Sequence, residues 1–399
     1  MVPETHVFTR QTSDGPAQMT AMQKTDLLIV TCEYSPFPGG IATYCKSLAA
    51  TLGATGCQVA VIAPDYDEAE PDVPNVSVTR PLKHHSIPPK TFPGLVKQLR
   101  ALPKDAIILC ADIRSVAIVY ALRFLHGRSF RAMVHGSEVS KLSSKSIVNR
   151  QIRQAYLQAE KVYFNSDATA RIFRTTVGDP KDGLVTHLGL SPDWYVDPPP
   201  EFEDQALSAL PECAKVFCSV GRLDSRKGQL QAIEALAACK TADKTMDNIH
   251  YVVVGKTVDV EYRYALIDRA HEAGINLLLP GPVSQSDLLR LFSLSVAHLL
   301  FAQNVPGKIE GFGLVLLEAG AQACPSIVSD VGGIPEVVGD AGIIVSDGKT
   351  ETYAKEITRL LEDEVSARAL GERMLARTRE FTWENCARAS FPEFFVGNI

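Results

Sequence analysis

Short apolar runs alternate along this chain with segments of helical periodicity. Continuous apolar runs such as residues 26–31 and 58–63 are typical of buried parallel strands, whose two faces are both covered. Residues 115–125 instead carry apolar side chains at helical spacing. The alternation predicts an α/β fold with open, doubly wound parallel sheets. Further strands, some ending in a turn, are predicted at residues 76–79, 106–110, 131–134, 162–166, 216–220, 251–255, 276–283 and 342–345. Residues 185–189 close the first half, and residues 297–301 lead into a later loop.

The pattern restarts in the second half, and 399 residues exceed the usual size of one domain, so we expect two domains. Between the halves lies a proline-rich, acidic stretch of the kind found in linkers. The predicted divisions are a disordered polar tail (residues 1–25), a first doubly wound domain (26–195), a linker (196–212), a second doubly wound domain (213–380) and a terminal helix (381–399).

Charge is unevenly divided along the chain. Residues 1–195 hold 21 Lys and Arg against 17 Asp and Glu, a net charge of +4, whereas residues 196–399 hold 19 against 29, a net charge of −10. The absence of a dense basic stripe with interleaved aromatics argues against nucleic-acid binding. The basic first half, with a predicted basic helix at residues 141–161, could meet an anionic acceptor or a membrane surface. The alternative is an uneven spread of charge on solvated faces.

The chain has nine cysteines and none forms a Cys-x-x-Cys pair, which favours reduced thiols over a disulfide framework or a zinc site. No apolar run reaches membrane-spanning length without charges. We therefore expect a cytoplasmic protein, with peripheral contact to the inner face of a membrane as an open possibility.

A glycine loop followed by a helix is the first candidate for chemistry. Glu310 is followed by Gly311, Phe312 and Gly313, and Glu318 lies about a turn into the predicted helix. Free backbone N–H groups at such a helix start favour phosphate, whereas carboxylates suit the paired hydroxyls of a ribose or sugar. The alternative is an ordinary loop-to-helix junction whose glutamates are solvated or capping.

Cations and glycines gather at the turn after the strand at 216–220. Arg222, Arg226 and Lys227 lie between Gly221 and Gly228. A guanidinium fork and an ammonium together suit a diphosphate, although a basic surface turn has the same composition.

Two further turns follow strands of the first half. Gly39 and Gly40 come after a proline-containing turn, and His135 directly follows the strand at 131–134. Ligands of parallel sheets bind at the carboxyl ends of strands, so both turns are site candidates. The glycines do not form Gly-x-Gly-x-x-Gly, which argues against a dinucleotide fingerprint. An ordinary turn and a structural histidine are the alternatives.

These motifs resemble those of the retaining glycosyltransferases of family GT4. The resemblance rests on Glu310 and Glu318 with seven residues between them, on the segment 332–338 (Gly-Gly-Ile-Pro-Glu-Val-Val), and on the Gly-Gly, His-Gly and Gly-Arg-Leu…Lys-Gly motifs in order. It implies the GT-B fold, in which two Rossmann-like doubly wound domains face a central cleft. The terminal helix would then cross back to the first domain.

The resemblance also implies roles for individual residues. Arg222 and Lys227 would grip the donor diphosphate, with Arg226 the less certain cation, while Glu318 would bind ribose and Glu310 the sugar. No cofactor and no metal are implied. The implied catalytic residues are Glu310, His135, Arg222 and Lys227, and the implied donor-binding residues are Gly39, Gly40, Arg222, Lys227, Val283, Glu310, Gly311, Phe312, Gly313, Leu314 and Glu318.

The function implied is transfer of a hexosyl unit from a UDP- or GDP-sugar to an acceptor hydroxyl with retention at the anomeric carbon. The acceptor would be a glycan, a lipid-linked sugar or a small molecule in polysaccharide, glycolipid or glycoconjugate biosynthesis. A sugar-nucleotide epimerase of similar architecture, a non-catalytic nucleotide-sugar binder and a nicotinamide-dependent oxidoreductase are the alternatives. The missing dinucleotide fingerprint counts against the oxidoreductase.

Overall fold

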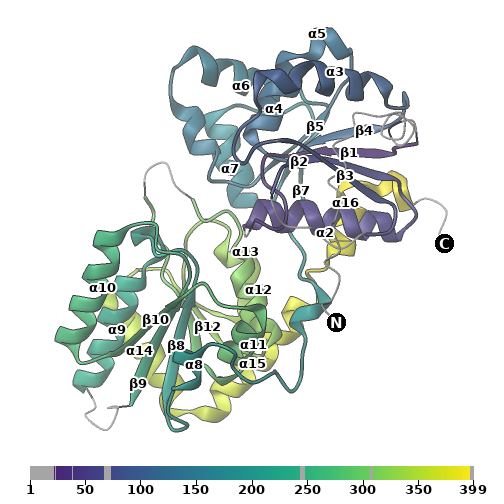
Figure 1. The fold of residues 1–399 in the computed structure, drawn as a ribbon. Helices are drawn as coiled ribbons and strands as arrows, with labels where there is room; N and C mark the ends of the chain where they lie inside the picture. The colour runs from purple at the N-terminus through teal and green to yellow at the C-terminus, as the bar shows by residue number, and fades with distance from the viewer. Residues whose placement is uncertain are drawn as a thin grey trace, which may run out of the picture. The chain divides into compact units, whose positions relative to one another are not determined.

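The computed structural model describes residues 22, 24–37, 39–66, 73–242, 248–305 and 309–395. Most of the predicted tail and Lys308 lie outside these residues. The chain divides into two compact units, residues 1–132 and 133–399, and the division falls within strand β5. Figure 1 shows the elements in chain order.

The first sheet is parallel and has the strand order β3-β2-β1-β4-β5-β6-β7. Every residue of β1 and β2 is buried, as their apolar runs predict. The strands are β1 (Leu27–Val30), β2 (Val59–Pro64), β3 (Val76–Leu82), β4 (Ile107–Cys110), β5 (Arg131–Val134), β6 (Val162–Phe164) and β7 (Gly183–Val185). The helices between them are α2 (Gly40–Ala54), α3 (Phe92–Ala101), α4 (Ile113–Ala121), α5 (Arg123–His126), α6 (Ile147–Gln158) and α7 (Asp167–Thr176).

The second sheet is also parallel, with the strand order β10-β9-β8-β11-β12-β13. Its strands are β8 (Lys215–Val220), β9 (Ile249–Val254), β10 (Asn276–Gly281), β11 (Ala297–Leu300), β12 (Ser326–Ser329) and β13 (Ile343–Val345). The helices are α8 (Gln205–Ser208), α9 (Gln229–Ala242), α10 (Val260–Ala273), α11 (Gln285–Leu294), α12 (Leu314–Ala321), α13 (Ile334–Val338), α14 (Thr350–Glu362), α15 (Glu364–Thr378) and α16 (Trp383–Ser390).

Alternate side chains of the second sheet enter two separate cores. Phe217 and Tyr251 pack with residues of α9, α10 and α14, whereas Cys218 and Val252 pack with residues of α11 and α12. In Figure 1 these two sets of helices lie on opposite sides of the sheet. Successive residues of a strand point to opposite faces, so one apolar run fills both cores. The predicted fold class, α/β with doubly wound sheets, is confirmed.

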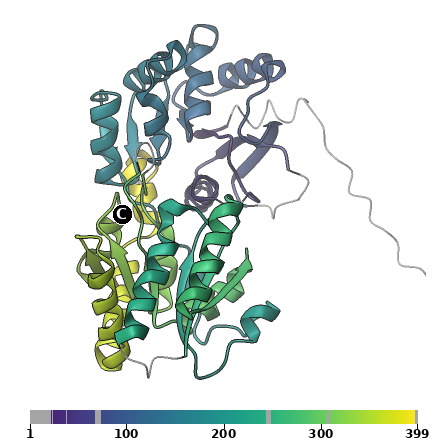
Figure 2. The same ribbon diagram turned by 90° about the vertical axis from the view of Figure 1, so that its left-hand side faces the viewer.

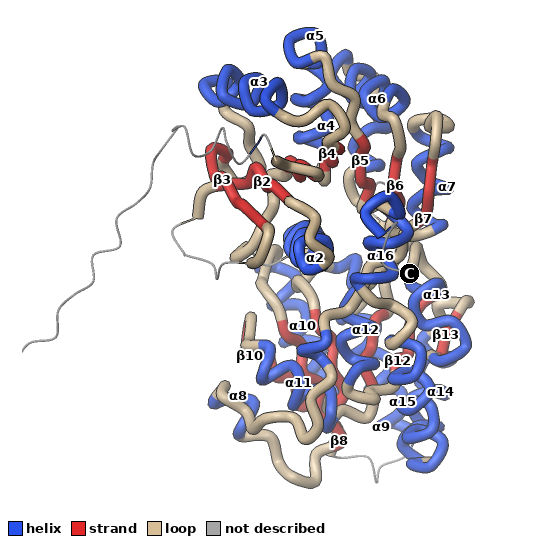
Figure 3. Tube along the Cα trace, turned by 90° about the vertical axis from the view of Figure 1, so that its right-hand side faces the viewer, coloured by secondary structure: helices blue, strands red, loops and turns tan. Residues whose placement is uncertain are grey.

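The last helix packs on the first sheet. The Tyr163 hydroxyl of β6 donates a hydrogen bond to the Ser390 carbonyl at 2.6 Å, and the rings of Tyr163 and Phe391 lie 5.5 Å apart. Figures 2 and 3 show α16 beside this strand. None of the helices in the described part of the chain is long and apolar enough to cross a bilayer.

Several elements differ from the prediction in detail. Residues 115–125 form two helices, α4 and α5, and the basic stretch at 141–161 forms a 3-10 turn (Val139–Ser143) followed by α6. The last strand of the first sheet is β7, which ends at the start of the segment 185–189 that was expected to close the first half. Strand β12 was not predicted, because Ser326 and Ser329 leave only two apolar residues between them.

Candidate functional site

The turn between β8 and α9 places its three cations, Arg222, Arg226 and Lys227, in different environments. Asp224 accepts a hydrogen bond from the Arg226 N–H at 3.1 Å and starts a 3-10 turn, Ser225–Lys227. Gly228 ends it in the left-handed region, where a Cβ would lie 1.9 Å from the Phe301 carbonyl oxygen. This geometry places Arg226 and Lys227 inside the protein, whereas Arg222 is exposed.

Arg226 and Lys227 both bind Glu310. Arg226 Nη1 lies 2.6 Å and Lys227 Nζ 2.8 Å from Glu310 Oε2, and the three side chains are only 8%, 13% and 12% exposed. Burial by itself would raise the pKa of Glu310, but the charges and hydrogen bonds of Lys227 and Arg226 outweigh it and lower the pKa to about 2. Glu310 is therefore ionised across the physiological range.

Glu318, eight residues later, has the opposite environment. It is half-buried on α12, and no group within the described parts of the chain donates a hydrogen bond to it. Burial raises the pKa of Glu318 to about 7. A half-buried carboxylate without a hydrogen-bond donor of the described chain is a candidate for binding a ligand's hydroxyl groups.

The helix that carries Glu318 begins without a side-chain cap. Gly313 occupies its N-cap position with a φ of 92° and has no side chain to accept hydrogen bonds from the first turn. Leu314, the first helical residue, is half-buried. An uncapped helix start of this kind offers backbone N–H groups and the positive end of the helix dipole to an anion.

The glycine loop before this helix packs closely on the turn that contains His135. A Cβ on Gly311 would lie 2.0 Å from the His135 carbonyl oxygen, and the Gly311 carbonyl accepts a hydrogen bond from Ser166 Oγ at 2.6 Å. The other side of the loop is equally tight, since a Cβ on Gly333 would lie 2.3 Å from the Gly311 carbonyl oxygen. Glycine is required at these positions because backbone meets backbone.

The structure also fixes the backbone on both sides of His135. Its N–H donates to Glu138 Oε1 at 2.5 Å, and its carbonyl accepts from Asn165 Nδ2 at 2.9 Å. Glu138 and Asn165 are both buried, and the His135 side chain is half-buried. Glu138 therefore holds the turn, a role that the sequence left undefined.

Glu336, in the Gly-Gly-Ile-Pro-Glu segment, caps helix α7. Its carboxylate accepts hydrogen bonds from the N–H groups of Asp167 and Ala168 at 2.7 and 2.8 Å, and His187 Nε2 lies 3.4 Å away. The sequence reading gave Glu336 no role. Asn165 and Ser166 after β6 are residues that favour a helix start, so the sequence alone could indicate where α7 begins. It could not indicate that Glu336, far along the chain, accepts the hydrogen bonds of that helix start.

The remaining predicted residues have mixed positions. The Phe312 ring is buried, with ring centroids of His187 and Phe381 each 5.9 Å away, so only its backbone could reach a ligand. Val283 is half-buried against the core formed with α11. In the first unit, Gly39 and Gly40 are exposed at the start of α2, which has no side-chain cap.

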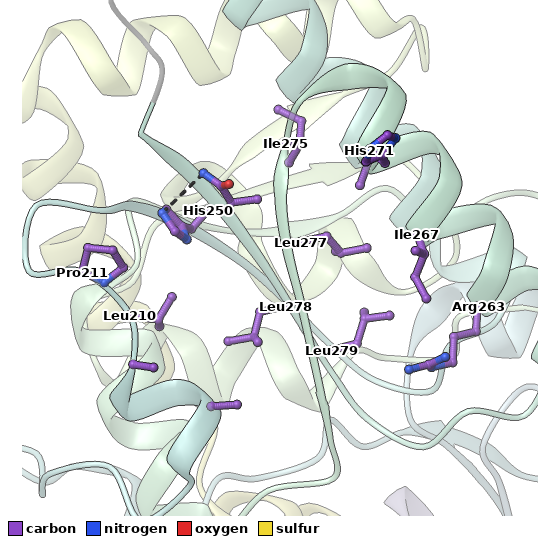
Figure 4. A pocket seen from close by; sticks show the side chains of 14 residues that line it. Leu210, Pro211, His250, Arg263, Ile267, His271, Ile275, Leu277, Leu278 and Leu279 are labelled. Atoms are coloured by element: carbon purple, nitrogen blue, oxygen red, sulfur yellow. Dashed lines mark hydrogen bonds between the residues drawn. The ribbon is translucent and has the colours of Figure 1, made fainter.

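A cavity of about 670 Å³ lies beside the edge strand β10, between α8 and α10. Figure 4 shows its apolar floor of Leu277, Leu278 and Leu279, with Arg263 and His271 on α10. None of the predicted site residues lines it. The candidate site is therefore the charged cluster around Glu310 rather than this cavity.

Two family models match the chain. The model for "Glycosyltransferase Family 4" matches residues 38–194, and that for "Glycosyl transferases group 1" matches residues 201–377. A GDP-mannose-dependent alpha-(1-6)-phosphatidylinositol monomannoside mannosyltransferase of Mycobacterium tuberculosis is 26% identical over 93% of this chain and 98% of the relative. A D-inositol 3-phosphate glycosyltransferase of Corynebacterium glutamicum is 32% identical over 44% of this chain and 41% of the relative.

Solved structures share the fold. Anabaena HepE in complex with UDP-glucose has a TM-score of 0.72 and 18% identity, covering 92% of this chain and 98% of that one. At this identity the likeness shows the fold alone, and it confirms the predicted GT-B architecture.

Proposed function

Because the chain belongs to the group 1 glycosyltransferases of family 4, we propose that it transfers a hexosyl unit from a nucleotide diphosphate sugar to an acceptor hydroxyl with retention at the anomeric carbon. The relatives' names are those of transferases, and no feature of the site favours an epimerase or a non-catalytic binder. UDP- and GDP-sugars are the proposed donor classes.

The ion cluster of Glu310, Arg226 and Lys227 carries this proposal. Arg226 and Lys227 both lie within 2.8 Å of one Glu310 oxygen. Cations suited to a diphosphate therefore lie beside a carboxylate suited to the hydroxyl groups of a sugar. Arg226 satisfies Glu310, so Lys227 can turn towards a diphosphate without leaving the carboxylate unpaired. The exposed Arg222 would add a guanidinium fork from the same turn.

Each group then has a defined task. Lys227, Arg222 and the uncapped start of α12 stabilise negative charge that grows on the leaving diphosphate. Glu318 accepts hydrogen bonds from the ribose hydroxyls, and Glu310 accepts them from the sugar. His135, half-buried beside the glycine loop, is assigned to the donor sugar.

Glu310 does not act as a nucleophile in this proposal. Burial would raise the pKa of Glu310, but the two cations outweigh it and lower the pKa to about 2. A carboxylate held in this way is a weak base and a weak nucleophile. The acceptor hydroxyl attacks the face that the diphosphate leaves, and a phosphate oxygen takes its proton. The bond to the diphosphate oxygen breaks as the new glycosidic bond forms, so configuration is kept.

A screen of UDP-, GDP- and ADP-sugars by thermal shift, followed by transfer assays with the donor that binds, tests the proposal. A ligand of the native state raises its stability by mass action. NMR of the product should show the same anomeric configuration as the donor. An inverted product, or conversion of donor without acceptor into an epimer, would contradict the proposal.

We further propose peripheral membrane contact through α6. Ile147 and Val148 in its first turn are 80% and 66% exposed, and Lys145 and Arg150 are exposed beside them. Exposed apolar side chains flanked by cations are typical of segments that meet an anionic lipid surface. Sedimentation with phosphatidylserine vesicles should carry down the wild type, and Ile147→Ser with Val148→Ser should reduce it. Equal binding to phosphatidylcholine would refute the charge contribution.

A further inference from the structure

Strand β10 is an edge strand with the sequence of a covered one. It stands first in the order β10-β9-β8-β11-β12-β13, so no strand of the described chain pairs with its outer side. Leu277, Leu278 and Leu279 nevertheless follow one another without a polar residue, and all three are only half-buried. A continuous apolar run is typical of strands that are covered on both faces. The sequence of β10 therefore suits an edge that another element covers.

The edge strand of the first sheet, β3, shows the usual protection. It carries the polar side chains of Ser77, Thr79 and Arg80. Such groups discourage the pairing of an exposed edge with another chain. In β10 the comparable device is Pro280, which has no N–H to donate and lies near the carboxyl end of the strand. The residues before Pro280 are left open to pairing.

The cavity of about 670 Å³ lies along this open edge. Residues 275–279 line one side of it, α10 contributes Ile267, and Leu210 closes it beside α8. In Figure 4 the three leucines of β10 lie between Leu210 and Ile267. Space beside an edge strand, with a helix towards each face of the sheet, has the shape that an added strand takes.

Helix α10 carries an apolar stripe next to the cavity. Val260, Tyr264 and Ile267 are 60%, 58% and 37% exposed, and their spacing places them on one face of the helix. Because Ile267 also lines the cavity, the stripe and the strand edge form one continuous surface. Contiguous exposed apolar surface of this kind marks an interaction site.

Charge favours a protein over an anionic lipid surface as the occupant. Glu261, Asp268 and Glu272 are exposed on α10, and Arg269 of the same helix is bound to Glu234 at 2.6 Å. Acidic side chains beside an apolar stripe repel the negative headgroups that attract basic helices.

The strand edge is complementary to itself in one antiparallel register. When Leu277 lies opposite its own copy, Ile275 lies opposite Leu279 of the partner subunit, and Asn276 lies opposite Leu278 of the partner subunit. Alternate residues of a strand share a face, so Ile275, Leu277 and Leu279 form an entirely apolar layer on the side that α10 covers. Cross-strand pairs of apolar side chains stabilise a sheet.

The same two-fold axis brings the two copies of α10 together. Leu266 and Ala270 of α10 pack in one core with Tyr251 of β9 and Leu277 of β10, so the helix covers these two strands. Neighbouring strands lie about 4.8 Å apart, so the two helices, two strands apart, lie about 10 Å from each other, which is a usual helix-packing distance. They run antiparallel, with their apolar stripes between them.

We propose that β10 and the stripe on α10 form a homodimer interface, in which antiparallel β10 strands join the second sheets of two copies of the chain. Helix α10 has 14 residues and is about 21 Å long, and three layers (α10, β10 and α8) about 10 Å thick give about 600 Å² per copy. A standard interface buries about 800 Å² per partner, so we expect a dissociation constant in the micromolar range. The proposal concerns assembly and does not depend on the proposed transferase function.

Disulfide trapping tests the register. Cys213→Ser provides the background, because Cys213 is the exposed cysteine of the chain and the others are buried. On it, Leu277→Cys should form a linked dimer on oxidation with diamide, since opposed Cα atoms of antiparallel strands lie about 4.5–5.5 Å apart, within the reach of a disulfide. Leu279→Cys is the matched control, because its own copy lies about 14 Å away along the strands. No linked dimer with Leu277→Cys, or equal linkage in both variants, overturns the register.

Sedimentation velocity over a concentration series tests the interface itself. The full chain should pass from a mass of 43.4 kDa to twice that mass as its concentration rises. Tyr264→Lys with Ile267→Lys should weaken association at least about tenfold, because like charges then face each other across the two-fold axis. Val365→Lys, at a valine of α15 that is 80% exposed, should not.

A mass that stays monomeric up to about 100 µM, or a dimer that Tyr264→Lys with Ile267→Lys leaves unchanged, overturns the proposal. Flotation with phosphatidylserine vesicles distinguishes the lipid occupant. A monomer whose vesicle binding is lost in Tyr264→Lys with Ile267→Lys would assign the stripe to a membrane and overturn the dimer. The trapping and sedimentation variants change different elements, so each experiment decides the question if a variant of the other fails to fold.

Discussion

The carboxyl edges of the two sheets share one architecture but carry different side chains. Each has a glycine loop before an uncapped helix, α2 in the first unit and α12 in the second. The first edge is aromatic and half-exposed: Phe37 and His84 follow β1 and β3 with ring centroids 4.0 Å apart, and Arg114, after β4, has no carboxylate partner in the described chain. The second is buried, and its Arg226 and Lys227 share one carboxylate. The contrast teaches that one architecture can offer different groups: aromatic side chains and a guanidinium at the first edge, and two cations paired with a carboxylate at the second.

The largest expected effect compares the two glycine loops. A Cβ on Gly311 would lie 2.0 Å from a backbone oxygen, whereas a Cβ on Gly39 would meet the side chains of Phe37 at 3.5 Å and Glu33 at 3.9 Å. Gly311→Ala should therefore lower the free energy of unfolding by about 4 kcal/mol or more, and Gly39→Ala by less than about 1 kcal/mol. Urea denaturation measures both. Similar losses in the two variants would show that the loops are equally tight.

The second prediction tests the charged edge. Lys227→Ala should lower turnover by about two to three orders of magnitude, because a buried donor to the developing charge is lost. Arg222→Ala should cost less, since its side chain is exposed. Lys355→Ala, at an exposed lysine of α14, is the control. Steady-state kinetics with the identified donor measures these values, and near wild-type turnover in Lys227→Ala would remove it from the site.

The third prediction separates Glu318 from Glu310 by pH. With the pKa of Glu318 raised to about 7 by burial, nucleotide affinity should rise about tenfold per pH unit below 7 and level off above it. Glu318→Gln should flatten the profile. The raised pKa also affects the free energy of unfolding. Because folded Glu318 keeps its proton at pH values where the unfolded chain has lost it, protonation of Glu318 stabilises the folded protein at low pH, and this contribution is lost as pH rises through 7. A profile unchanged by Glu318→Gln would assign the titration elsewhere.

A smaller effect is expected for Glu336, which caps α7. Glu336→Gln should cost about 1 kcal/mol of stability, as the loss of a helix cap usually does. Burial would raise the pKa of Glu336, but hydrogen bonds from His187, Asp167 and Ala168 lower it. Its contribution should therefore disappear as pH falls below the ordinary carboxyl range. Thermal unfolding at pH 7 and pH 3 measures the difference, and an equal cost at both would contradict the role of the charge.

The smallest effect is expected from metal removal. Protein cations at the second edge are proposed to stabilise the diphosphate, so EDTA should leave transfer unchanged. Activity assayed with EDTA and then with added Mg²⁺ or Mn²⁺ checks this expectation. A loss with EDTA that Mg²⁺ restores would mean that Lys227 and Arg222 are insufficient at this edge.

Local signals in the sequence predicted most of the elements and pointed to the candidate site residues. Apolar runs predict the buried strands because a strand covered on both faces needs apolar side chains throughout, and β1 and β8 form where they predict. The glycine loop and the spacing of Glu310 and Glu318 are contiguous, so they are readable without a structure. Strand β12 was missed because its apolar run is only two residues long.

Tertiary structure alone decided which groups meet. The turn at Gly228 buries Arg226 and leaves Arg222 exposed, although the sequence favoured Arg222. The tertiary structure also gives the two glutamates of one motif different pKa values. Burial would raise both, but the cations beside Glu310 outweigh it and lower that pKa to about 2, whereas burial by itself raises the pKa of Glu318 to about 7. Pairing and burial depend on residues far apart in the chain, such as Glu310 and Lys227, and no local pattern encodes such distances.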